Sequence, residues 1–387
     1  MVEARLYSFV PLMRAAEISS LRARSAAIGA FNVNFYAQAE GILEGLKKAE
    51  APGIIQASKG ANKFQGGAGK IQEMLLLAIM KGRYNIPIAL HLDHGDANSA
   101  RDCIDNGFSS VMIDASHLPE LENIAATKEI VLYAHPRRVG VEAEYGLLSG
   151  VEEDIAHQKG VYADPKFVPV FFDRSKTDAL AIAYGTSHGP NKGKTEALNV
   201  DIVRESYEAL KAHRMNLDRF LVSHGSSTVP AELVDEINRY GGSLKETSGV
   251  PEHKLLEAID SGIRKINIDT DLRLGITATF RKYFHDHPDI ENRSEALGLV
   301  KAMFDGKIPA KDKDGKPVDP AQFVDPRSYL QALMNARPEM LRQDYRDFED
   351  EAYAEVMGLI GERVASHVCN LARLFRSNSL AGEVGRV

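Results

Sequence analysis

The feature that most constrains the fold of this chain is an alternation, repeated eight times, of a short apolar segment and a segment with helical periodicity. Each apolar segment is rich in β-branched residues and ends at a polar residue or a glycine. Strands that are buried on both faces of a sheet give runs of this kind. We therefore predict eight buried strands, at residues 28–33, 52–58, 86–93, 108–116, 139–146, 179–187, 219–225 and 264–270.

The segments between these strands carry ordinary helix start and stop signals. Residues 98–107 begin with Asn-Ser and stop at Gly107, and Pro230 begins another helical pattern. Eight strands that alternate with helices predict an α/β fold, a (β/α)8 TIM barrel with a parallel sheet. An open, doubly wound sheet stays an alternative, because the number of strands does not show that the sheet closes.

The pattern changes after residue 286, so we expect three parts of one domain. Residues 1–286 form the barrel, and residues 287–326 form an irregular insertion, because residues 305–327 are rich in Lys, Asp, Gly and Pro. Residues 327–387 form a C-terminal helical extension, which packs on the barrel or contributes to an oligomer contact. Its apolar stripe consists of Tyr353, Val356, Met357, Ile360, Val364, Val368 and Leu371.

Composition excludes several classes of protein. A net charge of −7 argues against a general nucleic-acid binder, which normally has a basic surface. No segment approaches the roughly 18 apolar residues of a membrane span, and Glu3, Arg5 and Arg14 interrupt any signal-peptide core. Cys103 and Cys369 form no C-x-x-C motif and are expected to be free thiols of a reducing compartment. We expect a cytoplasmic protein without membrane contact.

Polar side chains fall at the predicted carboxyl end of every strand. Chemistry in TIM barrels takes place at that end of the sheet. A single polar residue there is often a helix cap, but eight such positions together, with histidines among them, exceed what capping explains. The residues are Asn34, Ser58, Asp93 with His94, Asp114, Glu144, His188, His224, and Asn267 with Asp269.

Three of these residues are histidines that precede a glycine: His94, His188 and His224. One such histidine alone would usually be a surface or core residue. Three neutral imidazoles at equivalent strand ends, with a fourth position left open, are typical of a catalytic zinc site. The glycines allow the backbone and a substrate to approach closely.

The loops after the last strands suit a substrate that carries phosphate. The segment "HGSSTVP" (224–230) offers backbone N–H groups and hydroxyls, and "NIDTD" (267–271) follows the last strand. Barrels often bind phosphate after strands 7 and 8. The segment "SHGPNKGK" (187–194) adds a glycine-rich loop with two lysines, although lysines of a solvated turn would look the same.

With these motifs the chain resembles the class II, metal-dependent fructose-1,6-bisphosphate aldolases, in the long form associated with the Calvin cycle and many bacteria. The matching segments, in order between about residues 29 and 275, are "AFNVN", "IALHLDHGD", "VEAEYGLLSGVEED", "YGTSHG", "HGSSTVP" and "KINIDTDLRL".

The resemblance implies a lyase of glycolysis and gluconeogenesis. The C-terminal helix and residues 287–326 exceed what a barrel of about 250 residues needs, so we expect a homodimer or homotetramer that uses them in part. Such a lyase would cleave fructose 1,6-bisphosphate reversibly to dihydroxyacetone phosphate and glyceraldehyde 3-phosphate through a zinc-stabilised enediolate. Tagatose 1,6-bisphosphate or sedoheptulose 1,7-bisphosphate are alternative substrates, because the sequence does not separate such similar sugars.

The resemblance also implies roles for individual residues. His94, His188 and His224 bind the catalytic Zn²⁺, and Asp114 and Glu144 serve a second metal position; a monovalent cation belongs to the same expectation. Asp93 is the acid/base, Glu152 moves a proton on the enediolate, and Asn267 helps to fix it. The residues expected to bind substrate are Ser58, Gly189, Gly225, Ser226, Ser227, Asn267, Ile268, Asp269, Thr270, Arg273 and Arg327.

Strand geometry supports the assignment of Asp93. Side chains alternate between the faces of a strand, so His91 and Asp93 share a face, while His94 begins the loop. At roughly 3.3 Å per residue, His91 lies about 6.6 Å below Asp93. It is therefore expected to be a histidine of the core beneath the site.

Three other functions remain open on the residues alone. A Schiff-base aldolase needs a buried lysine at the barrel mouth, and Lys59 is the lysine directly at a predicted strand end. A zinc hydrolase would need a base for its water nucleophile. A non-catalytic binding protein on an aldolase fold would not need the intact set of histidines with Asp93.

Overall fold

Eight parallel strands form a closed barrel in this computed structural model, which describes residues 6–147, 150–152, 155–157, 161–187, 198–245, 247–311 and 315–385. The strands are β1 (Ile28–Asn32), β2 (Gly53–Ser58), β3 (Ile88–Gly95), β4 (Ser110–Ile113), β5 (Gly140–Tyr145), β8 (Ala179–Ile182), β9 (Phe220–Ser223) and β10 (Ile263–Ile268). Their order around the barrel is β1-β10-β9-β8-β5-β4-β3-β2. The predicted barrel is confirmed, and the open sheet is wrong, because β1 pairs with both β2 and β10.

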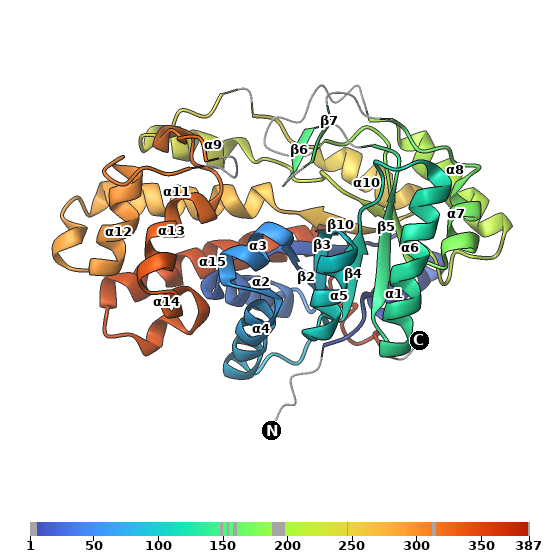
Figure 1. Cartoon of the computed structure of the whole chain (residues 1–387), viewed down its shortest axis with the longest axis horizontal. Helices are drawn as coiled ribbons and strands as arrows, with labels where there is room; N and C mark the ends of the chain where they lie inside the picture. Colours follow the sequence, from blue (N-terminus) through green and yellow to red (C-terminus); the bar gives the residue numbers. More distant parts are fainter. Residues whose placement is uncertain are drawn as a thin grey trace.

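Helices surround this barrel (Figure 1). Those that follow barrel strands directly or in pairs are α2 (Tyr36–Lys48), α3 (Lys59–Gln65), α4 (Ala68–Gly82), α5 (Ala97–Asp105), α6 (Glu120–Ala134), α7 (Val168–Ser175), α8 (Val200–Ala212), α9 (Ala231–Arg239), α10 (Glu252–Ser261) and α11 (Thr270–Asp286). A two-stranded antiparallel sheet, β6 (Gly150–Glu152) and β7 (Ile155–His157), follows β5. The helical patterns at residues 98–107 and after Pro230 are confirmed as α5 and α9.

Helix α1 (Phe9–Arg22) precedes the barrel and closes its amino-terminal end, which the strand pattern does not predict. Phe9, Leu12 and Met13 are fully buried against small side chains of the strands. Alanines at positions inside this end of the barrel leave room for the larger residues of α1. The strand alanines of this cluster are Ala30, Ala89, Ala179 and Ala181.

The predicted C-terminal helix is confirmed as α15 (Glu351–Leu374), and the whole apolar stripe is buried within this chain. Helix α15 packs mainly along α2 and α11. Gly41 and Gly45 of α2 make the close approach possible. A Cβ at Gly41 would lie 2.7 Å from the carbonyl oxygen of Gly361, and one at Gly45 would lie 2.6 Å from that of Ala365.

The segment 287–326 is only partly irregular, contrary to the prediction. It contains α12 (Glu295–Phe304), which buries Leu297, Val300 and Met303. The cluster of Lys, Asp, Gly and Pro begins only at residue 305, so it does not disturb this helix. Helices α12, α13 (Pro326–Ala336) and α14 (Glu339–Arg342) group at one end of the molecule, and α11 and α15 extend from this group toward the barrel (Figure 1).

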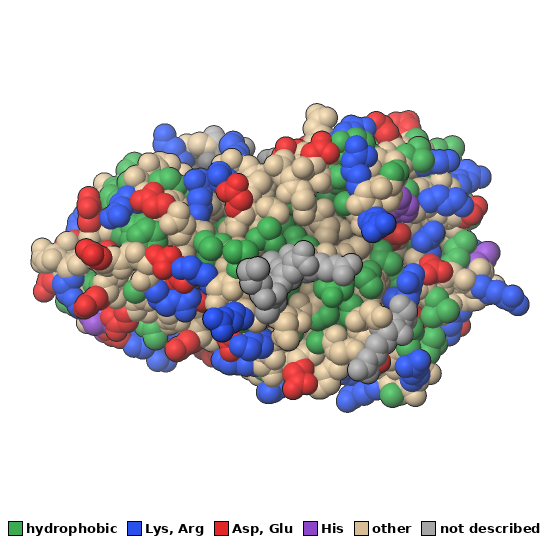
Figure 2. All heavy atoms as spheres, turned by 90° about the horizontal axis from the view of Figure 1, so that it is seen from below, with side chains coloured by type: hydrophobic (Ala, Val, Ile, Leu, Met, Phe, Trp, Pro, Cys, Tyr) green, Lys and Arg blue, Asp and Glu red, His purple; other side chains and the backbone are tan. Residues whose placement is uncertain are grey.

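The surface bears both signs of charge on the face that Figure 2 shows, where acidic side chains lie among the lysines and arginines. Among the helices of the described residues, none combines the length and the apolar character that a membrane span requires.

Candidate active site

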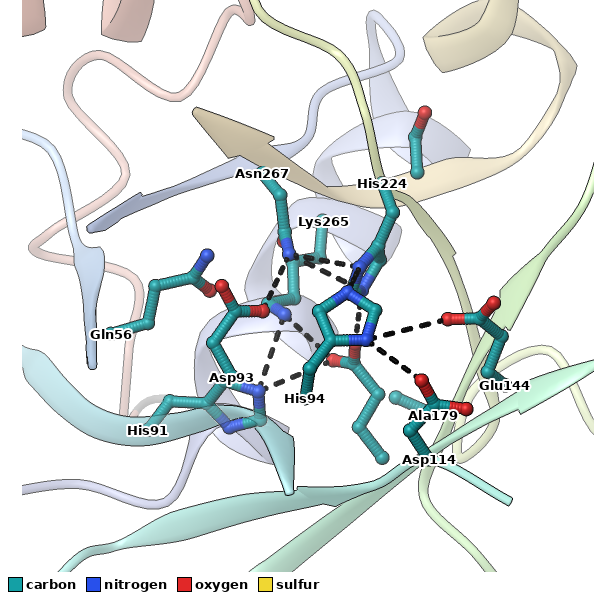
Figure 3. A network of polar contacts seen from close by, with 12 residues as sticks. Gln56, His91, Asp93, His94, Asp114, Glu144, Ala179, His224, Lys265 and Asn267 are labelled. Atoms are coloured by element: carbon teal, nitrogen blue, oxygen red, sulfur yellow. Dashed lines mark hydrogen bonds and ion pairs between the residues drawn. The ribbon is translucent and has the colours of Figure 1, made fainter. Parts of the chain in front are cut away.

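Side chains that point into the barrel change from apolar to polar along the strands, toward their carboxyl ends. On β3 the inward positions are Ala89, His91 and Asp93, two residues apart, because side chains alternate along a strand. Figure 3 shows the polar part, in which side chains from several strands converge. Its buried members include Gln56, His91, Asp93, Glu142, Glu144, His224, Lys265 and Asn267.

Asp93 is held by two amides. Its Oδ2 accepts a hydrogen bond from Nδ2 of Asn32 at 2.9 Å, and its Oδ1 accepts one from Nδ2 of Asn267 at 3.2 Å. Gln56 donates to Oδ1 of Asn32 at 2.7 Å and so fixes the orientation of that amide. The Asp93 side chain is 2% exposed. The carboxylate therefore has one orientation, directed at the mouth of the barrel beside His94.

His94 and His224 face each other across the barrel mouth, with Nε2 of His94 2.8 Å from Nδ1 of His224. A carboxylate holds the other nitrogen of each ring. Nδ1 of His94 lies 3.0 Å from Oδ2 of Asp114, and Nε2 of His224 lies 2.7 Å from Oε1 of Glu142. Glu144 is also near, with Oε2 3.8 Å from Nδ1 of His94.

These contacts fit a metal ion. An ionised carboxylate only accepts hydrogen bonds, so the two nitrogens bonded to carboxylates carry the protons. The two nitrogens that face each other then carry no hydrogen, and each presents a lone pair to the other. At 2.8 Å these lone pairs repel each other unless a cation lies between them. Histidines that bind metals have this arrangement, with the far N–H donated to a carboxylate. Among the described residues, two sets of side chains bring possible ligand atoms within 4.8 Å of one another: Asp93, His94 and His224, and His94, Asp114 and Glu144.

Electrostatics keeps these groups in the forms that metal binding needs. Burial, partly opposed by Glu142, lowers the pKa of the His224 imidazole, so the ring is neutral at pH 7. Burial alone would raise the pKa of Glu142, but Lys265 and His224 hold it well below the ordinary value. The pKa of Asp114 is likewise low, because the effect of His94 exceeds that of burial.

The two His-Gly pairs have local structural reasons. A Cβ at Gly95 would lie 2.7 Å from the carbonyl oxygen of Met112, so only glycine lets β3 pass β4 this closely. Gly225 has a φ of 60°, and a Cβ there would lie 2.5 Å from the carbonyl oxygen of Ser187. His94 itself has a φ of 48°. This left-handed conformation costs about 1–2 kcal/mol and turns the ring away from the strand direction toward His224.

Some of the predicted residues lie outside the described part of the chain. His188 and Gly189 are among them, so the third predicted zinc ligand stays a prediction. Glu152 ends β6, but its side chain is also outside the described part.

The predicted phosphate loops meet at the start of α11. Ser227 accepts hydrogen bonds at Oγ from the backbone N–H groups of Asp269, at 3.2 Å, and Thr270, at 3.1 Å. Ser226 points away from this point, because its Oγ bonds that of Ser223 at 2.7 Å. Ile268 is buried as the last residue of β10. The N–H groups at the start of a helix attract anions, so a phosphate would compete here with the Ser227 hydroxyl.

Arg273 and Arg327 come together around Asp325. Nη1 of Arg273 lies 2.8 Å, and Nη2 of Arg327 2.6 Å, from the same Oδ2 of Asp325. Arg273 also pairs with Asp269 at 2.5 Å, and Nη1 of Arg327 lies 3.5 Å from Oγ of Ser58. Burial raises the pKa of the Asp269 carboxyl to about 6, against the pull of Arg273. Segments far apart in sequence thus place two guanidinium groups beside the strand end that carries Ser58.

Sequence reasoning missed four interior residues and misplaced one. Asn32, rather than Asn34, is the amide of β1 that reaches the site, and the backbone N–H of Asn34 instead donates to Oε1 of Gln38 at the start of α2. Gln56, Glu142 and Lys265 lie two residues before Ser58, Glu144 and Asn267. This two-residue spacing was the signal that would have found them, because it places each on the same face of its strand.

The lysines argue against the Schiff-base alternative. Lys59, the lysine singled out in the sequence, pairs with Asp96 at 2.9 Å. Lys265 is fully buried inside the barrel, but its Nζ lies 2.8 Å from Oε2 of Glu142 and 3.4 Å from Nε2 of His91. An amine held in an ion pair with a buried carboxylate is a poor nucleophile.

Comparison with known proteins agrees with this geometry. The family described as "Fructose-bisphosphate aldolase class-II" matches residues 17–352. The fructose-bisphosphate aldolase of Giardia intestinalis is 41% identical over 297 residues, which is 76% of this chain and 90% of the relative. That of Treponema pallidum is 40% identical over 288 residues, which is 71% of this chain and 86% of the relative.

Among solved structures, the crystal structure of fructose-bisphosphate aldolase from Campylobacter jejuni superposes with a TM-score of 0.62. The alignment covers 97% of each chain at 19% identity, so this likeness supports the fold alone.

Proposed function

Because the chain belongs to the class-II fructose-bisphosphate aldolase family, we propose that it cleaves fructose 1,6-bisphosphate reversibly to dihydroxyacetone phosphate and glyceraldehyde 3-phosphate. The family is metal-dependent, and we propose Zn²⁺ as the metal. One observation supports this most directly: two histidine nitrogens with lone pairs face each other 2.8 Å apart, beside the buried carboxylate of Asp93.

In this proposal His94 and His224 hold the metal, together with His188. Imidazole nitrogen is a preferred zinc donor, and a three-histidine site leaves one position open for substrate. The metal ion, when bound, supplies a Lewis acid that polarises the ketone of the sugar. Asp114 and Glu144 lie behind His94 and would serve the second metal position.

Asp93 is proposed as the general base of cleavage. It would take the proton of the C4 hydroxyl as the bond between C3 and C4 breaks, and return a proton to that oxygen in the synthetic direction. Asn32 and Asn267 hold its two oxygens, so the carboxylate is already oriented before the substrate arrives. Oδ1 of Asn267 has no hydrogen-bond partner among the described residues and would accept one from a substrate hydroxyl. Glu152 would deliver the proton to C3.

The phosphates are proposed to bind at two places. Gly225, Ser227 and Thr270, with Gly189, would surround the phosphate of the dihydroxyacetone half through N–H groups and hydroxyls. Arg327, beside Ser58, would bind the phosphate of the aldehyde half, and Arg273 would add charge to the same region. Arginine suits this role because its planar group matches two phosphate oxygens at once. A homo-oligomer remains part of the proposal.

An assay of purified protein with fructose and tagatose 1,6-bisphosphates tests this function. We expect cleavage of the fructose sugar, loss of activity with a chelator and recovery when Zn²⁺ is added back. Treatment with borohydride in the presence of substrate should leave the activity unchanged. Activity that survives removal of all metal, or inactivation by borohydride, would contradict the proposal. Faster cleavage of tagatose bisphosphate would correct the substrate.

A further inference from the structure

Two fully buried charged residues, Glu142 and Lys265, have no part in the proposed chemistry. Both side chains are 0% exposed, and they lie inside the barrel beneath His224. Removing a pair of charges from water costs several kcal/mol for each ion before their attraction is counted. The opposite end of the same barrel is filled by apolar side chains, so the fold does not require charges at this depth. Their presence therefore points to a role in the site above them.

The two oxygens of Glu142 have different partners. Oε1 lies 2.7 Å from Nε2 of His224, and Oε2 lies 2.8 Å from Nζ of Lys265. The carboxylate is thus fixed at both ends and cannot rotate away from the histidine. Figure 3 shows Lys265 beside His224, with a dashed line that joins Lys265 to His91.

Rigid strands carry both partners. Glu142 is the third residue of β5 and Lys265 the third of β10, and neither is on a loop. By contrast His224 follows the end of β9, where the chain leaves the sheet. A side chain at the start of a loop gains a fixed orientation when it bonds to a group on a strand.

We propose that Glu142 and Lys265 form a positioning pair that orients the His224 ring with Nδ1 toward His94, and that this pair sets the affinity for the metal. The inference rests on the proposed metal-dependent function. Because Glu142 takes the N–H of Nε2, the lone pair of His224 stays on Nδ1. Without the pair the His224 ring could turn or change tautomer. Restoring the binding orientation would then cost free energy, which would weaken the binding of the metal.

The test replaces the pair by apolar side chains in Glu142→Leu/Lys265→Met, which leaves no unpaired buried charge. Glu142→Gln/Lys265→Met keeps an oxygen that can accept from His224 but removes both charges. The matched control is Glu17→Leu/Arg264→Met. This control also removes a buried ion pair, in which Nε of Arg264 lies 2.5 Å from Oε2 of Glu17. Arg264 precedes Lys265 on β10, so the two double variants change neighbouring positions of the same strand.

The measurement is the dissociation constant of Zn²⁺ for the metal-free full chain, by competition with a chelator of known affinity. Thermal unfolding of each metal-free variant is recorded beside it. We expect the Leu/Met variant to bind Zn²⁺ about 10–100-fold more weakly, as for other groups behind metal-binding histidines. The Gln/Met variant should fall between it and the parent, and the control should bind within about twofold of the parent, whatever its stability.

Kinetics at saturating Zn²⁺ gives a second readout. The Leu/Met variant should have a lower kcat and an unchanged KM for the bisphosphate, because the pair does not contact the phosphate loops. If the Leu/Met variant does not fold, the Gln/Met variant carries the test alone.

The outcomes separate the two proposals. A parent that binds no Zn²⁺ overturns the proposed function and the inference with it. A parent that binds Zn²⁺ while its folded variants bind equally tightly overturns the inference alone. Equal loss of affinity in the control would also overturn it, because the effect would then follow from stability.

Discussion

The lower half of the barrel interior, next to α1, is filled by apolar side chains, whereas the upper half, at the carboxyl ends of the strands, is filled by polar ones. The same strands build both halves. On β3 the inward residue changes from Ala89 to His91 to Asp93 over five positions. The lower half stabilises the barrel by burying apolar side chains. In the upper half, hydrogen bonds hold the polar side chains of the site in fixed orientations.

A second buried ion pair lies outside the barrel interior, on the other face of β10, and adjacent residues of that strand supply the two cations. Arg264 pairs with Glu17 of α1, and Glu17 also accepts hydrogen bonds from Tyr207 at 2.5 Å and Asn216 at 2.9 Å. This pair joins α1 to α8 and to the barrel. Lys265, one residue later, points the opposite way into the site. Similar charges thus join outer helices to the barrel on one face of β10 and, in our proposal, orient a metal-binding histidine on the other face.

The largest effect should come from Asp93 in the upper region. Asp93→Ala should keep the proposed zinc and lose about 10²–10⁴-fold in kcat, because the proposed general base is removed while the histidines remain. Steady-state rates and metal content of the same preparation check this. A variant with a normal rate, or one that has lost its zinc, would show that Asp93 has another role.

Glu17→Gln, in α1, should lower the stability of the protein and leave its activity nearly unchanged. It leaves Arg264 buried without its charged partner, which typically costs about 3–5 kcal/mol of stability. Urea unfolding should show this loss, while kcat of the folded protein stays within about twofold. A large fall in kcat at unchanged stability would mean that the two regions are coupled.

Arg327→Ala should raise KM for the bisphosphate. Hydrogen bonds to charged groups contribute about 1.5–3 kcal/mol, which corresponds to roughly a 10- to 150-fold effect. The matched control is Arg337→Ala at the other end of α13, where the arginine pairs with Glu339 at 3.4 Å. Equal KM values for the two variants would remove Arg327 from the proposed phosphate site.

Gly45→Ala tests the packing of α2 against α15, where a substitution should change stability and leave activity unchanged. The added Cβ would lie 2.6 Å from the carbonyl oxygen of Ala365, and such overpacking costs about 1–3 kcal/mol. Gly358→Ala in α15 is the control, because a Cβ there meets only the Tyr345 hydroxyl at 3.9 Å. This control should gain about 0.5–1 kcal/mol from the better helix propensity of alanine. Thermal unfolding distinguishes the two signs.

The smallest effect concerns pH and Asp271, which holds the backbone of the proposed phosphate loop. Its carboxylate accepts from the N–H groups of Thr228 at 2.9 Å and Val229 at 2.7 Å. Burial alone would raise its pKa, but His367 and these donors hold the pKa below the ordinary value of 3.8. A lowered folded-state pKa stabilises the protein above the unfolded pKa, and this contribution is lost as the pH falls below it.

Asp271→Asn should therefore be less stable than the parent near neutral pH, and the gap should narrow as the pH falls through about 4. Urea unfolding of both proteins along a pH series measures this. A gap that stays constant over the series would show that the charge of Asp271 contributes nothing.

Much of the site was predictable because it follows the strand ends. Asp93, His94, Asp114, Glu144, His224 and Asn267 were all placed at the barrel mouth from the sequence, and the structure brings them together. Helix α1 was not predicted, because an alternation of strands and helices does not say what closes the barrel. The approach of Arg273 to Arg327 was not predictable either, because nothing local to one residue indicates the other across such a long stretch of chain.

The sequence by itself determined the eight strands, their helices, and which residues lie where each strand ends, because these follow from local periodicity and local turn signals. Only the tertiary structure decided which interior side chains touch. Glu142 and Lys265 are 123 residues apart, and nothing local to either one indicates the other. Their contact exists because the sheet closes with a particular register, and register is a property of all eight strands together.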